Sequence, residues 1–243
     1  MNSENINKKN ENDSGLKIEI IPALLPDSFE HLKVEVEHVK NATKWIQIDV
    51  VDGNFAPTRT WPYNRKDQDD WNKLISQDMG LPFWEKINYE IDLMVKDQLS
   101  AARDWISAGV SRVIAHIESF DDESVEELIS YKEKYGVEIV LSLVPSTDNS
   151  VLDPYLDRID AVQFMGNDKI GHHGVELDEK VLNKIAILRA KKPNLPIGID
   201  IGVNEETIFD LRDAGVTRFS SGSMILDDDD PKSKIVEVLE SLE

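Results

Sequence analysis

The sequence predicts an α/β protein with the (β/α)8 TIM-barrel architecture. Short segments rich in Ile, Val and Leu alternate with amphipathic stretches along the chain, as buried parallel strands alternate with the helices that cover them. The first apolar segment starts at about residue 17 and the last at about residue 217, so the mean repeat is about 28 residues, close to the ~30 of a strand–helix–strand unit. Eight such repeats in 243 residues fit one barrel.

Each expected strand is short and is bounded by breakers or turn residues. In chain order the strands are Lys17–Leu25, Trp45–Val51, Ile87–Val95, Arg112–Glu118, Val137–Val144, Asp160–Gly166, Pro196–Gly202 and Thr217–Ser223. An open, doubly wound sheet is the main rival fold, but no GxGxxG motif follows the first strand. The closed barrel is therefore the preferred architecture.

The expected helices begin at residues that commonly cap helices, and several end near glycine. The first has apolar residues at helical spacing and Ser28 as its N-cap. The set is Ser28–Ala42, Asp97–Ala108, Asp122–Tyr135, Asp178–Lys191, Asn204–Ala214 and Pro231–Leu242. After Asp148 the pattern supports only one or two helical turns.

The chain is expected to form one folded domain. Residues 1–15 are polar and lack an apolar segment, which predicts a disordered tail rather than a secretory signal. Residues 16–243 form the single barrel domain, because no change of composition marks a second one. The longest irregular stretch, Asn54–Lys86, is rich in aromatic residues and is expected to be a lid or a small satellite core.

Composition limits the partners and cofactors. The formal net charge is −20, and a field of this sign repels nucleic-acid backbones and anionic membranes. No apolar run reaches membrane-spanning length. The absence of Cys excludes disulfides, thiolate nucleophiles and cysteine zinc sites. We therefore expect a cytoplasmic enzyme or binding protein with no nucleic-acid partner and no membrane partner.

In a barrel of this kind the active site lies at the carboxyl ends of the strands. Gln47 and Asp49 lie two positions apart, and therefore on one face of their strand. Carboxylates within apolar strands need a partner, because burying an unpaired charge is costly. The polar residues expected at this end are Gln47, Asp49, Asp92, His116, Glu118, Ser142, Asp200 and the run Ser221–Ser223.

Four segments around these residues form a recognisable set. They are IQIDVVDGNFAP (Ile46–Pro57), EIDLMV (Glu90–Val95), GIDIGV (Gly198–Val203) and SSGSMIL (Ser220–Leu226). In order, they resemble the patterns HxDxMDGxFVP, DxHLMV, VDGG and a late GSA loop of the ribulose-phosphate 3-epimerase family. The resemblance implies a TIM barrel of the ribulose-phosphate-binding type.

The resemblance also implies a reaction. It is the inversion of the carbon next to the keto group of a phosphorylated ketose, of the ribulose 5-phosphate and xylulose 5-phosphate type. One carboxylate removes a proton from one face, an acid returns one to the other face, and a divalent ion stabilises the enediolate. The residues that match the family's two catalytic aspartates are Asp49 and Asp200. The implied partner is a small phosphorylated sugar, and assembly into a homo-oligomer stays open.

The metal ligands implied by the resemblance are Gln47, Asp49, Asp92 and Asp200. The sequence departs from the family here, because the family has His at the positions of Gln47 and Asp92. A Gln carbonyl and three carboxylates are an all-oxygen set, which favours Mg2+ or Mn2+ and leaves Zn2+ and Fe2+ as alternatives. Without an ion the carboxylates would repel one another, and at least one is expected to hold a proton.

Further residues are expected to contact the sugar phosphate. Backbone N–H groups of glycine-rich turns bind phosphate without a basic side chain, and barrels place this site after the seventh and eighth strands. The expected contacts are Met94, Met165, Gly171, Gly174, Gly202, Ser221, Gly222 and Ser223. The positions that depart from the family pattern are Ala23, Val51, Ile201, His172 and His173.

Two other functions stay open. Loss of both family His residues would suit a non-catalytic phosphosugar-binding protein on the same barrel. A decarboxylase or aldolase related to orotidine phosphate decarboxylase is disfavoured, because the second strand continues from Asp49 to Asp52 without the Lys of an Asp-x-Lys-x-x-Asp motif. A metal-dependent epimerase is therefore the leading interpretation.

Overall fold

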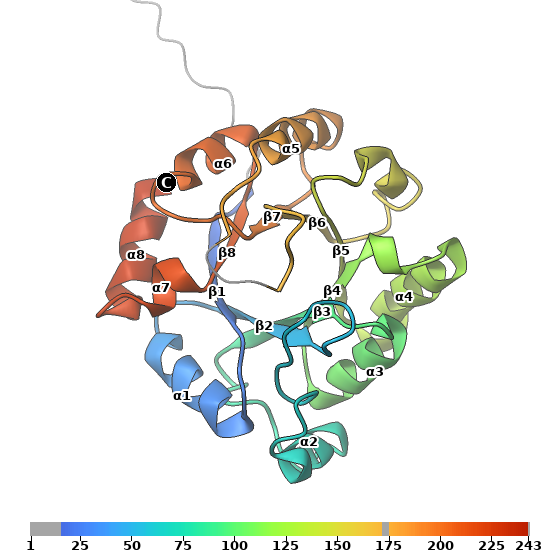
Figure 1. Ribbon diagram of the computed structural model, residues 1–243, viewed down its shortest axis with the longest axis vertical. Helices are drawn as coiled ribbons and strands as arrows, with labels where there is room; N and C mark the ends of the chain where they lie inside the picture. Colours follow the sequence, from blue (N-terminus) through green and yellow to red (C-terminus); the bar gives the residue numbers. More distant parts are fainter. Residues whose placement is uncertain (1–15, 172–174, 243) are drawn as a thin grey trace, which may run out of the picture.

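Eight parallel strands close into a barrel, and helices surround it (Figure 1). The strands are β1 (Glu19–Leu24), β2 (Trp45–Val51), β3 (Asn88–Met94), β4 (Arg112–His116), β5 (Glu138–Leu143), β6 (Ala161–Met165), β7 (Ile197–Asp200) and β8 (Arg218–Ser221). The helices are α1 (Phe29–Val39), α2 (Gln68–Ile75), α3 (Gln98–Ala108), α4 (Asp122–Tyr135), α5 (Lys180–Lys191), α6 (Ile208–Ala214), α7 (Ser223–Leu226) and α8 (Pro231–Leu242).

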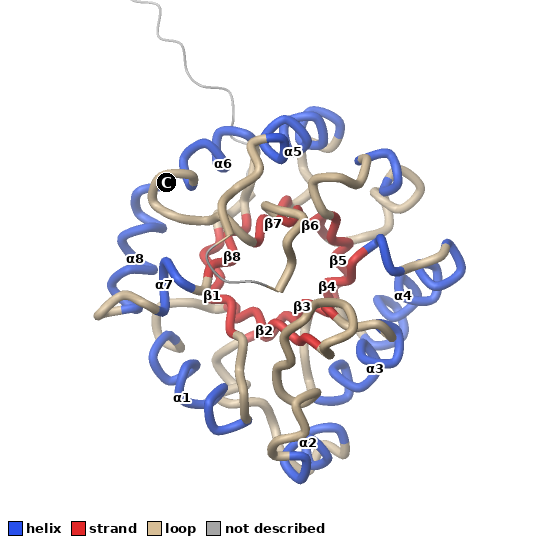
Figure 2. The backbone as a smooth tube through the Cα atoms, in the orientation of Figure 1, coloured by secondary structure: helices blue, strands red, loops and turns tan. Residues whose placement is uncertain are grey.

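Each strand pairs in parallel with its neighbours in chain order, and β8 closes the ring against β1. Figure 2 shows the strands as an inner ring and the helices as an outer one. The predicted (β/α)8 barrel is thus confirmed. The computed structural model describes residues 16–171 and 175–242. The tail of residues 1–15 and residues 172–174, which include Gly174, lie outside this part, so the predictions made for them stay predictions.

Several helix boundaries agree with the expected capping residues. The hydroxyl of Ser28 accepts a hydrogen bond from the backbone N–H of His31, as an N-cap does. Three of the helices end at Gly109, Gly136 and Gly215, which adopt the left-handed conformation with φ of 100°, 73° and 117°. Glycine adopts this conformation without the steric cost that a Cβ brings.

One weak helical pattern agrees with the structure, and one expected helix differs from it. As expected, the stretch after Asp148 forms only one short helical turn, the 3-10 helix η2 (Asn149–Leu152). α6 begins at Ile208 rather than at Asn204. The side-chain oxygen of Asn204 accepts hydrogen bonds from the backbone N–H groups of Glu206 and Thr207, at 2.9 and 3.0 Å. This local turn replaces the first turn of a helix.

Alternation along β2 shows how the sequence separates the core from the interior of the barrel. Ile46, Ile48 and Val50 are fully buried and belong to the hydrophobic core that the outer helices cover. Gln47 and Asp49 point the other way, into the barrel. There the side chain of Gln47 forms hydrogen bonds with Asp49 and with Asp200 of β7. Among the described residues, no helix is long and apolar enough to cross a bilayer.

The irregular stretch Asn54–Lys86 packs mainly on the outside of the barrel. Trp61 is fully buried, and its ring lies edge-on to those of Trp71 and Trp105, with ring centroids 5.6 and 5.8 Å away. These rings belong to the main core, so the expected satellite core is continuous with it. Trp84 is 63% exposed and does not take part.

Candidate active site

A cavity of about 220 Å³ opens at the carboxyl ends of the strands. Its charged lining side chains are Asp49, Glu176 and Asp200, all acidic. The lining residues are Ala23, Leu25, Asp49, Met94, Met165, Gly171, Val175, Glu176, Asp200, Ile201, Gly202, Val203, Asn204, Ser220, Ser221, Gly222 and Ser223. Among the described residues, the cavity lining therefore offers an anion backbone dipoles, hydroxyl groups and the amide of Asn204, and no basic side chain.

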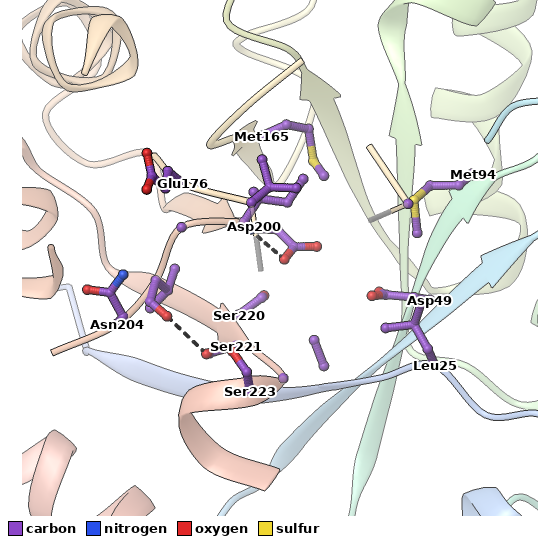
Figure 3. Close-up of a pocket in the computed structure, with 17 residues that line it drawn as sticks. Leu25, Asp49, Met94, Met165, Glu176, Asp200, Asn204, Ser220, Ser221 and Ser223 are labelled. Carbon is purple, nitrogen blue, oxygen red and sulfur yellow. Dashed lines mark hydrogen bonds between the residues drawn. The ribbon is translucent and has the colours of Figure 1, made fainter. Parts of the chain in front are cut away.

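Asp49 and Asp200 face one another across this cavity (Figure 3). Asp49 comes from β2 and Asp200 from the end of β7, and they are 5% and 8% exposed. Gln47, two residues before Asp49 on β2, connects the two carboxyl groups. Its side-chain N–H groups donate to Asp49 Oδ1 at 2.7 Å and to Asp200 Oδ2 at 2.9 Å. The backbone N–H of Ile201 donates to the other oxygen of Asp200. Both carboxyl groups thus have fixed orientations.

Both carboxyl groups hold a proton more tightly than an ordinary aspartate. Burial, with the nearby charges of Asp200 and Asp92, raises the pKa of Asp49 well above its usual range. Burial and the charge of Asp92 raise the pKa of Asp200 to about 7, although hydrogen bonds from Gln47 and Ile201 act in the opposite direction. Near neutral pH such a pair can share one proton between two carboxyl groups. In that state one carboxyl group can accept a proton and the other can donate one.

Asp92 lies behind the wall of the cavity and is fully buried. Its Oδ1 lies 2.7 Å from His116 Nε2, and its Oδ2 accepts a hydrogen bond of 3.1 Å from the side chain of Gln163. Burial alone would lower the pKa of His116, but the charge and the hydrogen bond of Asp92 raise it above its usual value. Asp92 and His116 therefore form a buried hydrogen-bonded pair beside the cavity.

The residues present fit a divalent cation. Asp49, Asp92 and Asp200 each offer an oxygen within 4.8 Å of the other two. Gln47 Oε1 is buried and has no hydrogen-bond partner among the described residues. If the amide group turns over, this oxygen takes the place of the nitrogen, 2.7 and 2.9 Å from the carboxylate oxygens. Neighbouring ligands of an octahedral Mg2+ are separated by about 2.9 Å, since each lies about 2.1 Å from the ion.

Two loops meet at the mouth of the cavity. The hydroxyl of Thr58, after β2, donates to the carbonyl of Gly171, after β6, at 3.1 Å. A Cβ on Gly171 would lie 2.6 Å from the Cβ of Ala56, and φ of Gly171 is +76°, so this close approach requires glycine. Phe55 and Ile170 pack against the same small apolar cluster. In Figure 1 the segment after β6 extends over the centre of the ring.

The comparisons with known proteins agree with this geometry. A profile of the Ribulose-phosphate 3 epimerase family matches residues 19–226. The chain belongs to the ribulose-phosphate 3-epimerase family. The ribulose-phosphate 3-epimerase of Schizosaccharomyces pombe is 26% identical over 90% of this chain and 92% of its own length. That of Mycobacterium tuberculosis is 28% identical over 89% of each chain.

Solved structures support the same fold. A 3-hexulose-6-phosphate synthase from Salmonella typhimurium superposes with a TM-score of 0.68 at 14% identity and covers 93% of this chain and 100% of its own. A KGPDC from Streptococcus mutans has a TM-score of 0.71 at 13% identity and covers 93% of this chain and 98% of its own. Identity this low bears on the fold alone. Membership of the epimerase family supports an epimerase-type isomerase and does not favour a non-catalytic binder.

The structure brings most of the site residues named from the sequence to one cavity. Gln47 and Asp92 stand directly behind its wall, in contact range of the lining carboxylates. Gly174 lies outside the described residues. Those that line the cavity are Asp49, Met94, Met165, Gly171, Asp200, Gly202, Ser221, Gly222 and Ser223. The roles assigned to them stay predictions.

Ile201 is a departure from the epimerase family pattern that the backbone accommodates under strain. It keeps a left-handed conformation, with φ of +73°, which is costly for a β-branched residue. Its carbonyl oxygen would lie 2.0 Å from a Cβ at Gly166, so the ends of β6 and β7 approach closely at this point. The strained turn carries the Ile201 N–H that binds Asp200.

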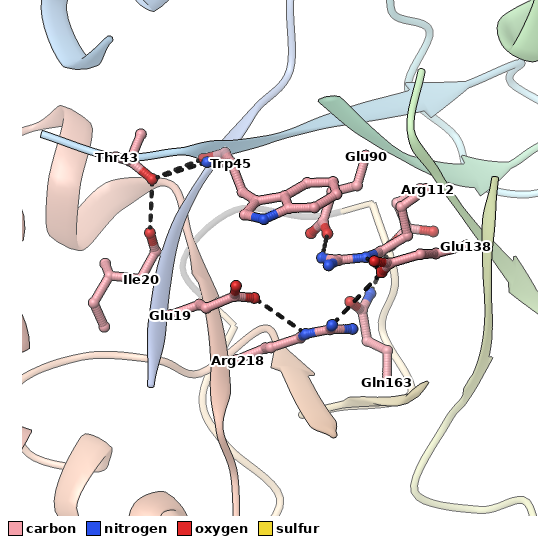
Figure 4. A network of polar contacts seen from close by, with 10 residues as sticks. Glu19, Ile20, Thr43, Trp45, Glu90, Arg112, Glu138, Gln163 and Arg218 are labelled. Carbon is pink, nitrogen blue, oxygen red and sulfur yellow. Dashed lines mark hydrogen bonds and ion pairs between the residues drawn. The ribbon is translucent and has the colours of Figure 1, made fainter. Parts of the chain in front are cut away.

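A second polar network lies at the opposite, N-terminal end of the barrel and was not predicted from the sequence (Figure 4). Arg112 is 2% exposed and forms ion pairs with Glu90 and Glu138. Its guanidinium group also lies 3.7 Å from the centre of the Trp45 ring. Arg218 pairs with Glu19 in the same network. This network lies at the N-terminal end of the barrel, and neither Arg112 nor Arg218 lines the cavity.

The pH dependence of stability offers a test of the raised pKa of Asp200. In the presence of a chelator, the contribution of Asp200 to stability is expected to fall as pH rises from about 4 to about 7, because the folded chain binds this proton more tightly than the unfolded chain does. This contribution is fully present below the ordinary pKa of 3.8 and is lost as pH rises through about 7. Thermal unfolding across this range measures it.

Surface carboxylates with lowered pKa values increase stability as pH rises, which opposes the effect of Asp200. Comparison with Asp200→Asn, measured over the same pH range, isolates the contribution of Asp200. The unchanged protein should lose more stability across this interval than the variant does. Parallel pH profiles for the two proteins would contradict a raised pKa at Asp200.

Proposed function

We propose that this epimerase-family member inverts the carbon next to the keto group of a phosphorylated ketose of the ribulose 5-phosphate or xylulose 5-phosphate type. The observation that carries the proposal is the opposed pair Asp49 and Asp200 in one cavity. Both are buried, both have a raised pKa, and Gln47 holds both in place. Two such groups can exchange a proton with opposite faces of one carbon.

The proposed reaction moves two protons. The ionised carboxylate takes the proton from carbon 3, and the electrons of that C–H bond move to the keto oxygen, which gives an enediolate. The protonated carboxyl group on the other side then donates its proton to carbon 3, and the carbonyl forms again. The two aspartates exchange roles in the reverse direction. Burial and the neighbouring carboxylates raise the pKa of both aspartates, which favours the protonated form that one of the two needs in this starting state.

A divalent ion would be held by Asp49, Asp92 and Asp200, and by the carbonyl oxygen of Gln47 once its amide group has turned over and no longer donates to the two aspartates. The ion would supply positive charge beside the oxygens of the enediolate. The proposal names Mg2+ or Mn2+, because all four donors are oxygen atoms. Zn2+ and Fe2+ are the alternatives. Metal analysis of the protein purified without chelator would identify the ion.

The phosphate is proposed to bind at the far end of the same cavity, near Gly202, Ser221, Gly222 and Ser223. Gly202 has φ of +76°, and a Cβ there would lie 2.9 Å from Leu177. This position therefore requires glycine, and its backbone can approach a ligand closely. A cytoplasmic location and assembly into a homo-oligomer stay predictions of the sequence.

Two measurements test the proposed function. The first is conversion of D-ribulose 5-phosphate to D-xylulose 5-phosphate, followed by NMR with Mg2+, Mn2+, Zn2+ or Fe2+ present in turn. The second is the shift in melting temperature caused by the same sugar phosphate and by D-ribulose without phosphate. We expect conversion to D-xylulose 5-phosphate. We also expect the melting temperature to shift with D-ribulose 5-phosphate but not with D-ribulose. A shift without product under any of the four divalent ions would instead identify a phosphosugar-binding protein.

A further inference from the structure

His116 contacts the clustered carboxylates from outside the cavity and has no role in the proton transfers proposed above. It ends β4, is fully buried and does not line the cavity. Its Nε2 lies 2.7 Å from Asp92 Oδ1. Its Nδ1 has no hydrogen-bond partner among the described residues. Within this part of the chain, the polar interaction of the ring is therefore directed to Asp92.

The position of His116 is fixed from two further sides. Its backbone N–H donates to the side-chain oxygen of Gln98 at 2.9 Å. The ring of Phe55 packs against the imidazole, with centroids 5.0 Å apart. Phe55 belongs to the loop after β2, at the mouth of the cavity. A ring held in this way presents Nε2 to Asp92 in one orientation.

Asp92 needs such a partner. Its carboxylate lies close to those of Asp49 and Asp200, and like charges push one another apart. His116 engages one of its oxygens and Gln163 the other, so neither oxygen can rotate away without losing a buried hydrogen bond. Carboxylates that bind metal ions are commonly fixed by hydrogen bonds of this kind, and the loss of one typically weakens ion binding by about 10–100-fold.

We propose that His116 is a positioning residue that holds Asp92 toward Asp49 and Asp200, and thereby sets the affinity of the site for a divalent cation. The proposal rests on the ion site included in the proposed function. It does not require that His116 touch the ion or the sugar.

Two substitutions that differ only in reach test this role. In His116→Gln, the amide nitrogen falls near the place of Nε2 and can still donate to Asp92. In His116→Asn, it falls near the place of Nδ1, which makes no hydrogen bond, and cannot reach Asp92. Both variants remove the imidazole and keep an amide. Ser142→Ala is the matched control, because Ser142 is the strand partner of His116 and its buried hydroxyl has no partner among the described residues.

The readout is the dissociation constant for Mn2+, measured on the full chain by the EPR signal of free Mn2+ at one pH. We expect His116→Asn to bind about 10–100-fold more weakly, and His116→Gln and Ser142→Ala to bind nearly as the unchanged protein does. Circular dichroism and melting temperature establish that each variant is folded.

The outcomes separate this inference from the proposed function. If the unchanged protein and His116→Asn bind Mn2+ equally well, or if the Asn and Gln variants are weakened equally, His116 does not position Asp92, and the ion site stands. If the unchanged protein binds no Mn2+ at millimolar concentration, the ion site fails, and the role of His116 fails with it.

Discussion

Asp49→Asn and Asp200→Asn are each expected to slow inversion strongly and to leave proton exchange on one face of the substrate. Asn keeps a carbonyl oxygen but cannot carry the proton, so each variant lacks one of the two proton carriers. The remaining carboxyl group can still remove a proton from the epimer whose C–H bond points toward it, exchange that proton with solvent, and return a deuteron to the same face. Inversion should fall by about 10²–10⁴-fold.

The decisive result is the pattern of labelling. In D2O, NMR should show deuterium at carbon 3 of ribulose 5-phosphate with one variant, and of xylulose 5-phosphate with the other. Asp210→Asn makes the same chemical change at an exposed position of α6 and should leave both inversion and exchange intact. Labelling of the same epimer by both variants would show that Asp49 and Asp200 do not serve opposite faces.

Arg112→Ala is expected to lower the free energy of unfolding by about 3–5 kcal/mol, because it leaves a buried carboxylate without its cation. Glu90 is 2% exposed and pairs with Arg112. Burial already raises the pKa of Glu90 even with Arg112 present. The change also removes the guanidinium group from the face of Trp45. Urea unfolding at neutral pH measures the loss.

Arg158→Ala is the control for this prediction. Arg158 forms two hydrogen bonds with Glu126, at 2.6 and 2.5 Å, but the pair is exposed, so its removal should leave the free energy of unfolding nearly unchanged. Adding Glu90→Gln to Arg112→Ala should recover part of the loss, because it removes the orphaned charge. Equal losses for Arg112→Ala and Arg158→Ala would refute the stabilising role of the buried network.

The barrel was predictable because its signals are local. Apolar strands of period two and capped amphipathic helices repeat along the chain, and parallel strands bring their carboxyl ends to one side. Asp49 and Asp200 could therefore be assigned to the same end of the barrel from their positions within strands. The resemblance of the surrounding segments to the epimerase family patterns added the prediction that these two aspartates act together.

The contacts of these residues were not predictable, because they depend on side chains that are far apart in sequence. Gln47 and Asp200 are separated by 153 positions, and nothing in the local sequence of β2 indicates that the amide of Gln47 bridges two carboxylates. Gln163 is a polar residue in an apolar strand, which was a signal of a buried partner, but its partner Asp92 is 71 positions away. Arg112 and Glu90 were not predicted to pair, because they lie on different strands and 22 positions apart.

The most direct test of the account is the isotope content of the product that the unchanged protein makes from D-ribulose 5-phosphate in D2O with Mg2+ or Mn2+. Two carboxyl groups that exchange with solvent should give D-xylulose 5-phosphate with deuterium at carbon 3 and at no other carbon. Product that retains the original hydrogen at carbon 3, or no product with either ion, would contradict inversion by Asp49 and Asp200.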